Sequence, residues 1–94
     1  MQIVNRQAIM EAYEKHPEWK ASLTAWIKIT EGASWRNFPE VRMTFNSADR
    51  VGKHIIFNIA HNRARLAAII NYADQRVTVA EVVSHAEYDR KDWE

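Results

Sequence analysis

Cysteine is absent from this chain of 94 residues, which excludes a disulfide scaffold and any thiolate metal site. Only two glycines and two prolines are present, so there is little room for a flexible linker or a low-complexity tail. No apolar run approaches the length of a membrane span, and residues 1–6 lack the apolar segment of a signal peptide. We therefore expect one domain over residues 1–94, located in the cytoplasm and without membrane contact.

An excess of charge of one sign is also missing, because 13 Lys and Arg are balanced by 12 Asp and Glu. This balance argues against a general nucleic-acid coating protein. Between Arg50 and Arg65, however, the chain carries four Lys or Arg and two His but no Asp or Glu. A local cationic segment in a nearly neutral chain indicates a site for an anion, and phosphodiester is the commonest polymeric anion in a cell. The four histidines have no metal-like spacing, so we expect no metal and no cofactor.

The N-terminal third predicts a short strand followed by two helices. Gln2 to Val4 favours a strand, and Asn5 is expected to be the N-cap of a helix over Arg6 to Lys15. His16-Pro17 ends that helix and starts the next, which we expect to stop at a left-handed glycine cap formed by Gly32. The apolar stripe of the second helix consists of Trp19, Leu23, Trp26, Ile27 and Thr30.

Residues 35–45 fit two patterns. Pro39-Glu40-Val41 favours a short helix, whereas alternation of Val41, Met43 and Phe45 favours a strand; we expect the helix. Residues 46–49 predict a turn. The remainder predicts an antiparallel meander, with strands over residues 54–60, 65–72 and 76–84 and turns at 60–63 and 73–75. The first strand alternates, and the second is apolar on both faces, which suits a central strand. Residues 85–93 are expected to form a brief helical turn or an ordered tail.

The predicted fold class is therefore α+β. A short N-terminal strand adds to one edge of the C-terminal antiparallel sheet, which gives four strands, and the helical hairpin packs on that sheet. Because the 73–75 turn joins antiparallel strands, the start of one strand lies beside the end of the next. Arg65 and His85 should therefore meet at the same end of the sheet, with Tyr88 within reach.

An Arg, a His and a Tyr at one sheet end suit phosphodiester chemistry. Arg offers two parallel donors to phosphate oxygens, His transfers protons near neutral pH, and Tyr donates a hydrogen bond or stacks on a base. RNA supplies its own nucleophile, the 2′-hydroxyl. Structural roles compete with this interpretation: Arg65 can form a salt bridge with Glu81, Glu87 or Asp89, His85 can cap Tyr88 or backbone, and Tyr88 can belong to the core.

Short motifs over most of the chain resemble HigB-type toxins of bacterial type II toxin–antitoxin systems, within the RelE-like superfamily. The motifs are His16-Pro17, Leu23-Thr24-Ala25-Trp26, Ala33-Ser34-Trp35, Phe45-Asn46-Ser47-Ala48, Ile56-Phe57-Asn58-Ile59, Asn62 with Arg65-Leu66, Ile70-Asn71-Tyr72 and His85-Ala86-Glu87-Tyr88-Asp89. The sequence departs from the family at Ala60-His61, where a glycine-bearing turn is usual, and at Ala64, where an aromatic residue is common.

The resemblance implies a RelE-like fold and an mRNA interferase, which is a metal-independent endoribonuclease that cuts translated mRNA in the ribosome. It also implies a HigA-like helix-turn-helix antitoxin that neutralises the toxin, with operator DNA bound only through their complex. By position, Arg65 resembles the arginine that contacts the scissile phosphate, and His85 and Tyr88 stand where the family keeps acid–base or stacking groups. The candidate RNA-binding residues are Lys53, His54, Asn58, Asn62 and Arg63.

A non-catalytic module is the alternative. In that case the same fold binds RNA or an antitoxin and acts as a transcriptional co-regulator of its operon. The chain has no helix-turn-helix pattern of its own, so DNA contact is expected to come chiefly through the partner.

Overall fold

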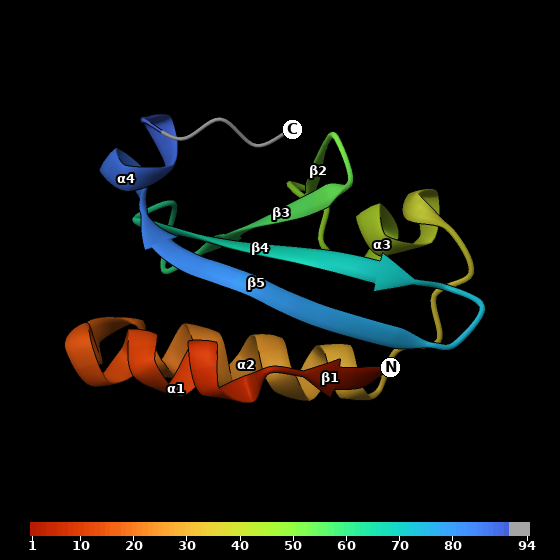
Figure 1. Cartoon of the computed structure of the whole chain (residues 1–94), viewed down its shortest axis with the longest axis horizontal. Helices are drawn as coiled ribbons and strands as arrows, with labels where there is room; N and C mark the ends of the chain where they lie inside the picture. Colours follow the sequence, from red (N-terminus) through yellow and green to blue (C-terminus); the bar gives the residue numbers. More distant parts are fainter. Residues whose placement is uncertain (91–94) are drawn as a thin grey trace.

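A computed structural model describes residues 1–90 and shows an α+β fold built on one mixed sheet (Figure 1). The strands are β1 (Gln2–Val4), β2 (Asp49–Val51), β3 (His54–Ile59), β4 (Ala64–Asn71) and β5 (Arg76–Ser84). The helices are α1 (Arg6–Lys15), the 3₁₀ turn η1 (Pro17–Trp19), α2 (Lys20–Glu31), α3 (Phe38–Thr44) and α4 (His85–Asp89). The α+β class is confirmed. Trp93, the last residue of the expected tail, lies outside the described residues.

The sheet has the strand order β1-β5-β4-β3-β2, with one strand more than the sequence predicted. Strands β3 to β5 form the expected antiparallel meander, β2 extends it by one antiparallel strand, and β1 joins the edge in parallel with β5. The extra strand, β2, includes Asp49, which we had placed in a turn. It pairs with β3 across a tight turn in which Gly52 has a φ of 59°, a left-handed conformation that glycine adopts without strain.

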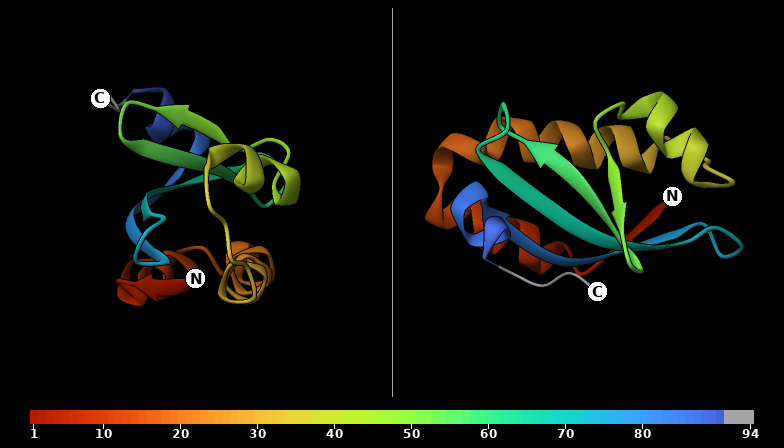
Figure 2. Two further views of the ribbon diagram at one scale, coloured as in Figure 1. Left: turned by 90° about the vertical axis from the view of Figure 1, so that its right-hand side faces the viewer. Right: turned by 90° about the horizontal axis from the view of Figure 1, so that it is seen from above.

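The α1–α2 hairpin covers one face of the sheet, as the sequence predicted (Figure 2). Asn5 does flank α1, but its side chain makes no capping bond; it donates to the carbonyl of Val79 instead. The predicted left-handed cap at Gly32 is wrong, because Gly32 has a right-handed φ of −80°. The amino group of Met1 donates to the carbonyls of Glu31 and Ala33, so these groups at the end of α2 are satisfied by a distant part of the chain.

The short helix expected within residues 35–45 is α3. The side chain of Asn37 accepts a hydrogen bond from the backbone N–H of Glu40, and Pro39 occupies the first turn. Val41 is fully buried on the inner side of this helix. Trp35 is buried beside it and donates to the hydroxyl of Thr44 at 3.0 Å. The guanidinium of Arg50 in β2 lies over the ring of Phe38, which places the start of α3 beside the β2–β3 hairpin.

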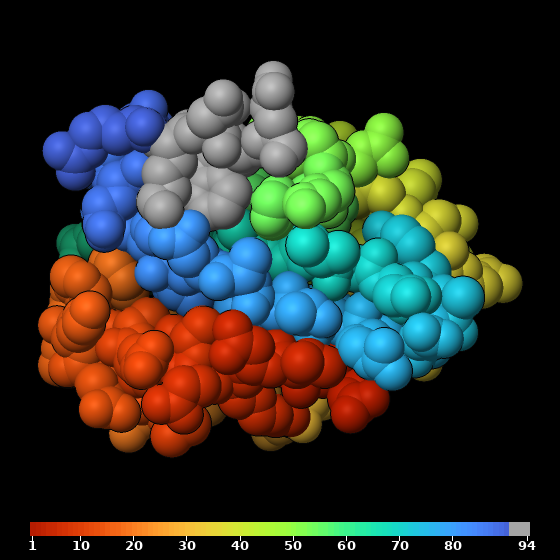
Figure 3. Space-filling model, viewed as in Figure 1, coloured from red at the N-terminus to blue at the C-terminus, as the bar shows by residue number. Residues whose placement is uncertain are grey.

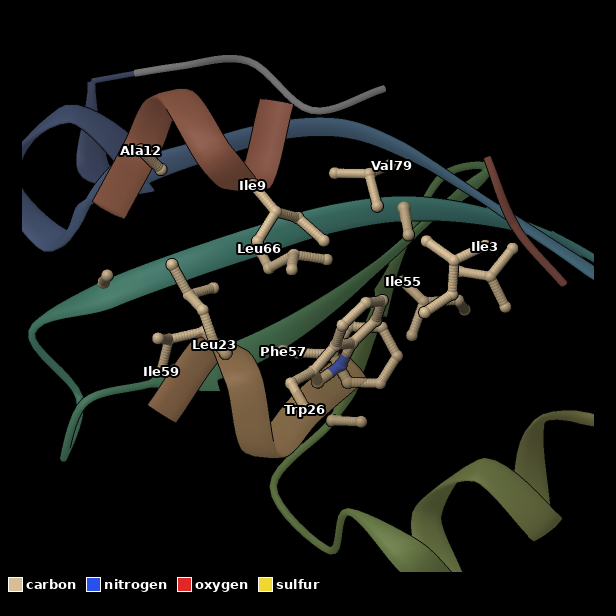
Figure 4. Packing of buried hydrophobic residues seen from close by; sticks show 14 of the residues in the cluster. Ile3, Ile9, Ala12, Leu23, Trp26, Ile55, Phe57, Ile59, Leu66 and Val79 are labelled. Atoms are coloured by element: carbon tan, nitrogen blue, oxygen red, sulfur yellow. The ribbon is translucent and has the colours of Figure 1, made fainter. Parts of the chain in front are cut away.

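The main core lies between the sheet and the α1–α2 hairpin (Figure 4). Trp26 of α2 meets Phe57 of β3 edge to face, with ring centroids 5.3 Å apart, and Ile9, Leu23 and Leu66 pack around them. A smaller cluster of Ile56, Ala67 and Val83 lies on the other face of the sheet. Among residues 1–90, no helix combines the length and apolar character that a membrane crossing demands. The face of the sheet that lacks the helical hairpin leaves polar side chains of the strands accessible, and we call it the open face.

Candidate active site on the open face of the sheet

Strand alternation places Arg65 on the open face, near one end of the sheet. Arg65 pairs with Asn58 on β3 and with Val83 on β5, so the three side chains form a row across the sheet. Its neighbours Ala64 and Leu66 point the other way and are fully buried under the helical hairpin. Arg65 is thus a half-buried cation on an otherwise apolar central strand.

Two backbone carbonyls and one ring hold the guanidinium of Arg65. Nη1 donates to the carbonyl of Asn62 at 3.0 Å and to that of Ala64 at 3.1 Å. The guanidinium carbon lies 5.6 Å from the centre of the Tyr88 ring, within the range of a cation–π contact. The N–H groups on Nη2 and Nε lie outside these bonds, and they have the paired geometry that binds phosphate oxygens.

The position of Tyr88 follows from α4, which begins directly at the end of β5. Ser84 and Glu87 form a reciprocal capping box, in which each side chain accepts a hydrogen bond from the other residue's backbone N–H. Hydrogen bonding of the Glu87 carboxylate to Ser84, chiefly to the backbone N–H of Ser84, lowers the pKa of that carboxyl below its usual value. The backbone N–H of His85 also donates to the carbonyl of Arg63 at 2.8 Å. The structure thus brings the side chains of Arg65 and Tyr88 together at one sheet end, and the backbone of His85 lies at the same end.

His85 has a partner that the sequence analysis did not assign to the site. Its Nδ1 lies 3.2 Å from a carboxylate oxygen of Asp89, one helical turn further along α4. A carboxylate beside Nδ1 can orient the ring with Nε2 turned away from Asp89. The four-residue spacing within a helix is the signal that could have identified this pair. Asp89 and Glu87, two of the three carboxylates considered as ion-pair partners of Arg65, are therefore engaged with His85 and Ser84.

The β3–β4 turn that holds Arg65 has an unusual backbone. Ala60, His61 and Asn62 all have positive φ, at 54°, 54° and 77°. For residues other than glycine this conformation costs on the order of 1 kcal/mol or more each. The turn is fixed on one side by the Ser22 hydroxyl of α2, which accepts from the Ala60 N–H at 2.9 Å. The turn is thus left-handed although alanine and histidine, and no glycine, occupy it.

The candidate RNA-binding residues divide between two places. Asn58, Asn62 and Arg63 lie at the Arg65 end, within β3 or the β3–β4 turn. Lys53 and His54 lie at the opposite end of β3, beside the β2–β3 turn. At about 3.3 Å per residue, the five positions from Lys53 to Asn58 span about 17 Å. Lys53 and His54 are therefore not part of the Arg65 constellation.

Comparison with known proteins identifies relatives over nearly the whole chain. Residues 19–91 match the HigB toxin family, described as the RelE-like toxic component of a toxin–antitoxin system. The mRNA interferase toxin HigB of Escherichia coli K12 is 28% identical over 92 residues, which cover 95% of this chain and 88% of that protein. The mRNA interferase HigB of Shigella flexneri matches to the same extent. That of Escherichia coli O6:H1 is 25% identical over 93 residues, covering 96% and 90%.

Proposed function

This chain belongs to the HigB family of RelE-like toxic components of toxin–antitoxin systems, and from that membership we propose that it is an mRNA interferase. It acts as a metal-independent endoribonuclease on translated mRNA in the ribosome. A HigA-like helix-turn-helix antitoxin neutralises it, and the pair contacts operator DNA through the antitoxin. The relatives named mRNA interferases align over nearly the full chain, so the non-catalytic alternative is not favoured.

One observation supports this function above the others: Arg65 is held by carbonyls and by the Tyr88 ring, with donors left for a phosphate. In the proposed reaction the 2′-hydroxyl of the RNA attacks the adjacent phosphorus, and the bond from phosphorus to the 5′-oxygen breaks. Arg65 stabilises the negative charge that builds on the non-bridging oxygens. Because the donors are fixed before substrate arrives, little reorganisation is needed in the transition state.

The two proton transfers fall to α4. His85, oriented by Asp89, takes the proton of the 2′-hydroxyl as general base. Tyr88 donates a proton or a hydrogen bond towards the departing 5′-oxygen. Asn58, Asn62 and Arg63 border this position and contact the neighbouring nucleotides. The products are a 2′,3′-cyclic phosphate and a 5′-hydroxyl, so the reaction needs neither water nor a cofactor in this step.

The test is cleavage of a labelled message in programmed ribosomes by purified wild-type and Arg65→Ala protein. Loss of transition-state charge stabilisation of about 3–4 kcal/mol is expected, which is a rate reduction of about 10²–10³. Arg76→Ala is the matched control, because Arg76 is an exposed cation at the other end of the sheet. A folded Arg65→Ala variant that cleaves like wild type contradicts the proposal.

Growth assays address the partner. Induction of the wild-type chain is expected to arrest growth, and co-expression of a neighbouring helix-turn-helix protein is expected to relieve the arrest. Growth arrest that persists with a stoichiometric complex would contradict neutralisation by this partner, and no arrest at all by folded protein would favour the non-catalytic alternative.

A further inference from the structure

A concave surface lies between α3 and the β2–β3 hairpin. These two elements lie on the side of the molecule away from α4 (Figure 3). We call this surface the α3–hairpin groove. It has a volume of about 380 Å³. The charged and aromatic side chains that line it are Arg36, Phe38, Arg50, Lys53 and Tyr72. None of the residues lining it within the described chain is an Asp or a Glu.

The groove has a net positive charge from two side chains. Arg36 forms an ion pair with Glu40, with Nη2 and a carboxylate oxygen 2.8 Å apart, so its charge is largely compensated. This pairing raises the pKa of Arg36 and lowers that of Glu40. Arg50 and Lys53 are both exposed, and they flank the turn at Gly52. Two exposed cations on one short hairpin can each contact a phosphate of a nucleic-acid backbone.

Aromatic rings line the same groove. The guanidinium carbon of Arg50 lies 5.6 Å from the centre of the Phe38 ring. Tyr72 is half-buried at the end of β4, and burial raises the pKa of its phenol, an effect that the nearby Arg50 partly offsets. The phenol therefore stays protonated over the physiological range and can donate a hydrogen bond. Cations beside aromatic rings are the combination that binds unpaired bases and their phosphates.

The groove does not belong to the Arg65 constellation. Arg50 pairs with Ile55, whose side chain lies in the main core, so Arg50 points to the face opposite Arg65. Lys53 is about 17 Å from Asn58 along β3. A nucleotide whose scissile phosphate contacts Arg65 is thus too distant to occupy the groove. The groove can therefore add affinity for RNA but takes no part in bond cleavage.

We propose that the α3–hairpin groove binds a single-stranded RNA segment away from the scissile bond, with Arg50 and Lys53 on phosphates and Tyr72 against a base. The inference rests on the proposed function, since it gives the toxin a second contact with RNA. Duplex RNA is disfavoured because its paired bases offer no free ring face to Tyr72.

The test measures binding of a fluorescent single-stranded RNA 12-mer to Arg65→Ala protein, a background that keeps the fold and avoids cleavage. Addition of Arg50→Ala and Lys53→Ala is expected to weaken binding at least tenfold. Each lost phosphate contact lowers the slope of log affinity against log salt by about 0.7, so the double change lowers it by about 1.4. The matched control is Lys15→Ala with Lys28→Ala, which removes two exposed cations on α1 and α2.

Three outcomes overturn the proposal: unchanged affinity and salt slope, an equal loss in the control, or tighter binding of an oligo-glutamate peptide than of the RNA. The last would assign the groove to an acidic protein partner. With Arg65 present, the groove variants are expected to raise KM for ribosome-bound message and leave kcat unchanged. If the wild type binds RNA through the groove but cleaves no message, the proposed function fails and the groove proposal stands.

Discussion

At the scale of single residues, a substitution at Tyr88 can separate a role in catalysis from a role in packing. Its ring contacts Arg65 and packs on the cluster of Ile56, Ala67 and Val83, and Tyr88→Phe keeps both contacts. We expect this variant to fold like wild type but to cleave about 100-fold more slowly in single turnover, because only the hydroxyl is lost. Thermal unfolding and cleavage in programmed ribosomes measure the two effects. Near-normal cleavage would assign Tyr88 to stacking or packing alone.

His85 and Asp89 are predicted to act as one unit. His85→Ala removes the proposed base and is expected to slow cleavage by about 10²-fold or more, whereas Asp89→Asn leaves the base without its orienting carboxylate. The double variant should lose less than the product of the two single effects, because groups that work together are non-additive. Single-turnover rates of the wild type and the three variants give the double-mutant cycle. Independent, multiplicative losses would show that Asp89 does not act through His85.

At the scale of elements, the β3–β4 turn stores backbone strain. Ala60→Gly with His61→Gly is expected to raise the free energy of unfolding by about 0.5–1 kcal/mol, since relief of left-handed strain exceeds the entropy that glycine adds to the unfolded chain. Urea denaturation measures the change. The control is Ala25→Gly on the exposed side of α2, which should lower stability by a similar amount. A loss of stability in the turn variant contradicts the strain assignment.

The same elements show how far sequence reasoning could go. Strand β3 was predictable from alternation and β4 from an apolar run that suits a central strand, and β5 follows as the return strand, whereas three residues of β2 are too few for either signal. The end of α2 depends on Met1, 30 and 32 positions from its two acceptors, so the local pattern around Gly32 could not reveal it.

For the candidate site, hairpin logic brought Arg65, His85 and Tyr88 to one end of the sheet. The remaining features needed coordinates. The turn conformation that presents the Asn62 carbonyl to Arg65 depends on backbone angles that alanine and histidine rarely adopt. The register of β3 with β4, which sets Asn58 beside Arg65 and leaves Lys53 beyond the far end of β3, also needed the coordinates.

At the scale of the whole molecule, stability depends on the core between the helical hairpin and the sheet. Trp26→Ala removes a ring that is only 2% exposed and that packs on Phe57. The expected cost is about 3–5 kcal/mol, a large share of the stability of a small domain. Urea denaturation and the soluble yield measure it, with Ile29→Ala on the exposed side of α2 as control. A Trp26→Ala variant as stable as wild type would show that Trp26 does not lie in the core.

The strand order has a consequence for the time at which the protein becomes active during its own synthesis. The first elements made, β1 and α1, pack against β5, and the bond from Asn5 to Val79 spans 74 positions. Contacts of such separation form late. Tyr88 reaches Arg65 only through α4, which follows β5 in the chain. The proposed cleavage of messages therefore requires that β5 and α4 have already been synthesised.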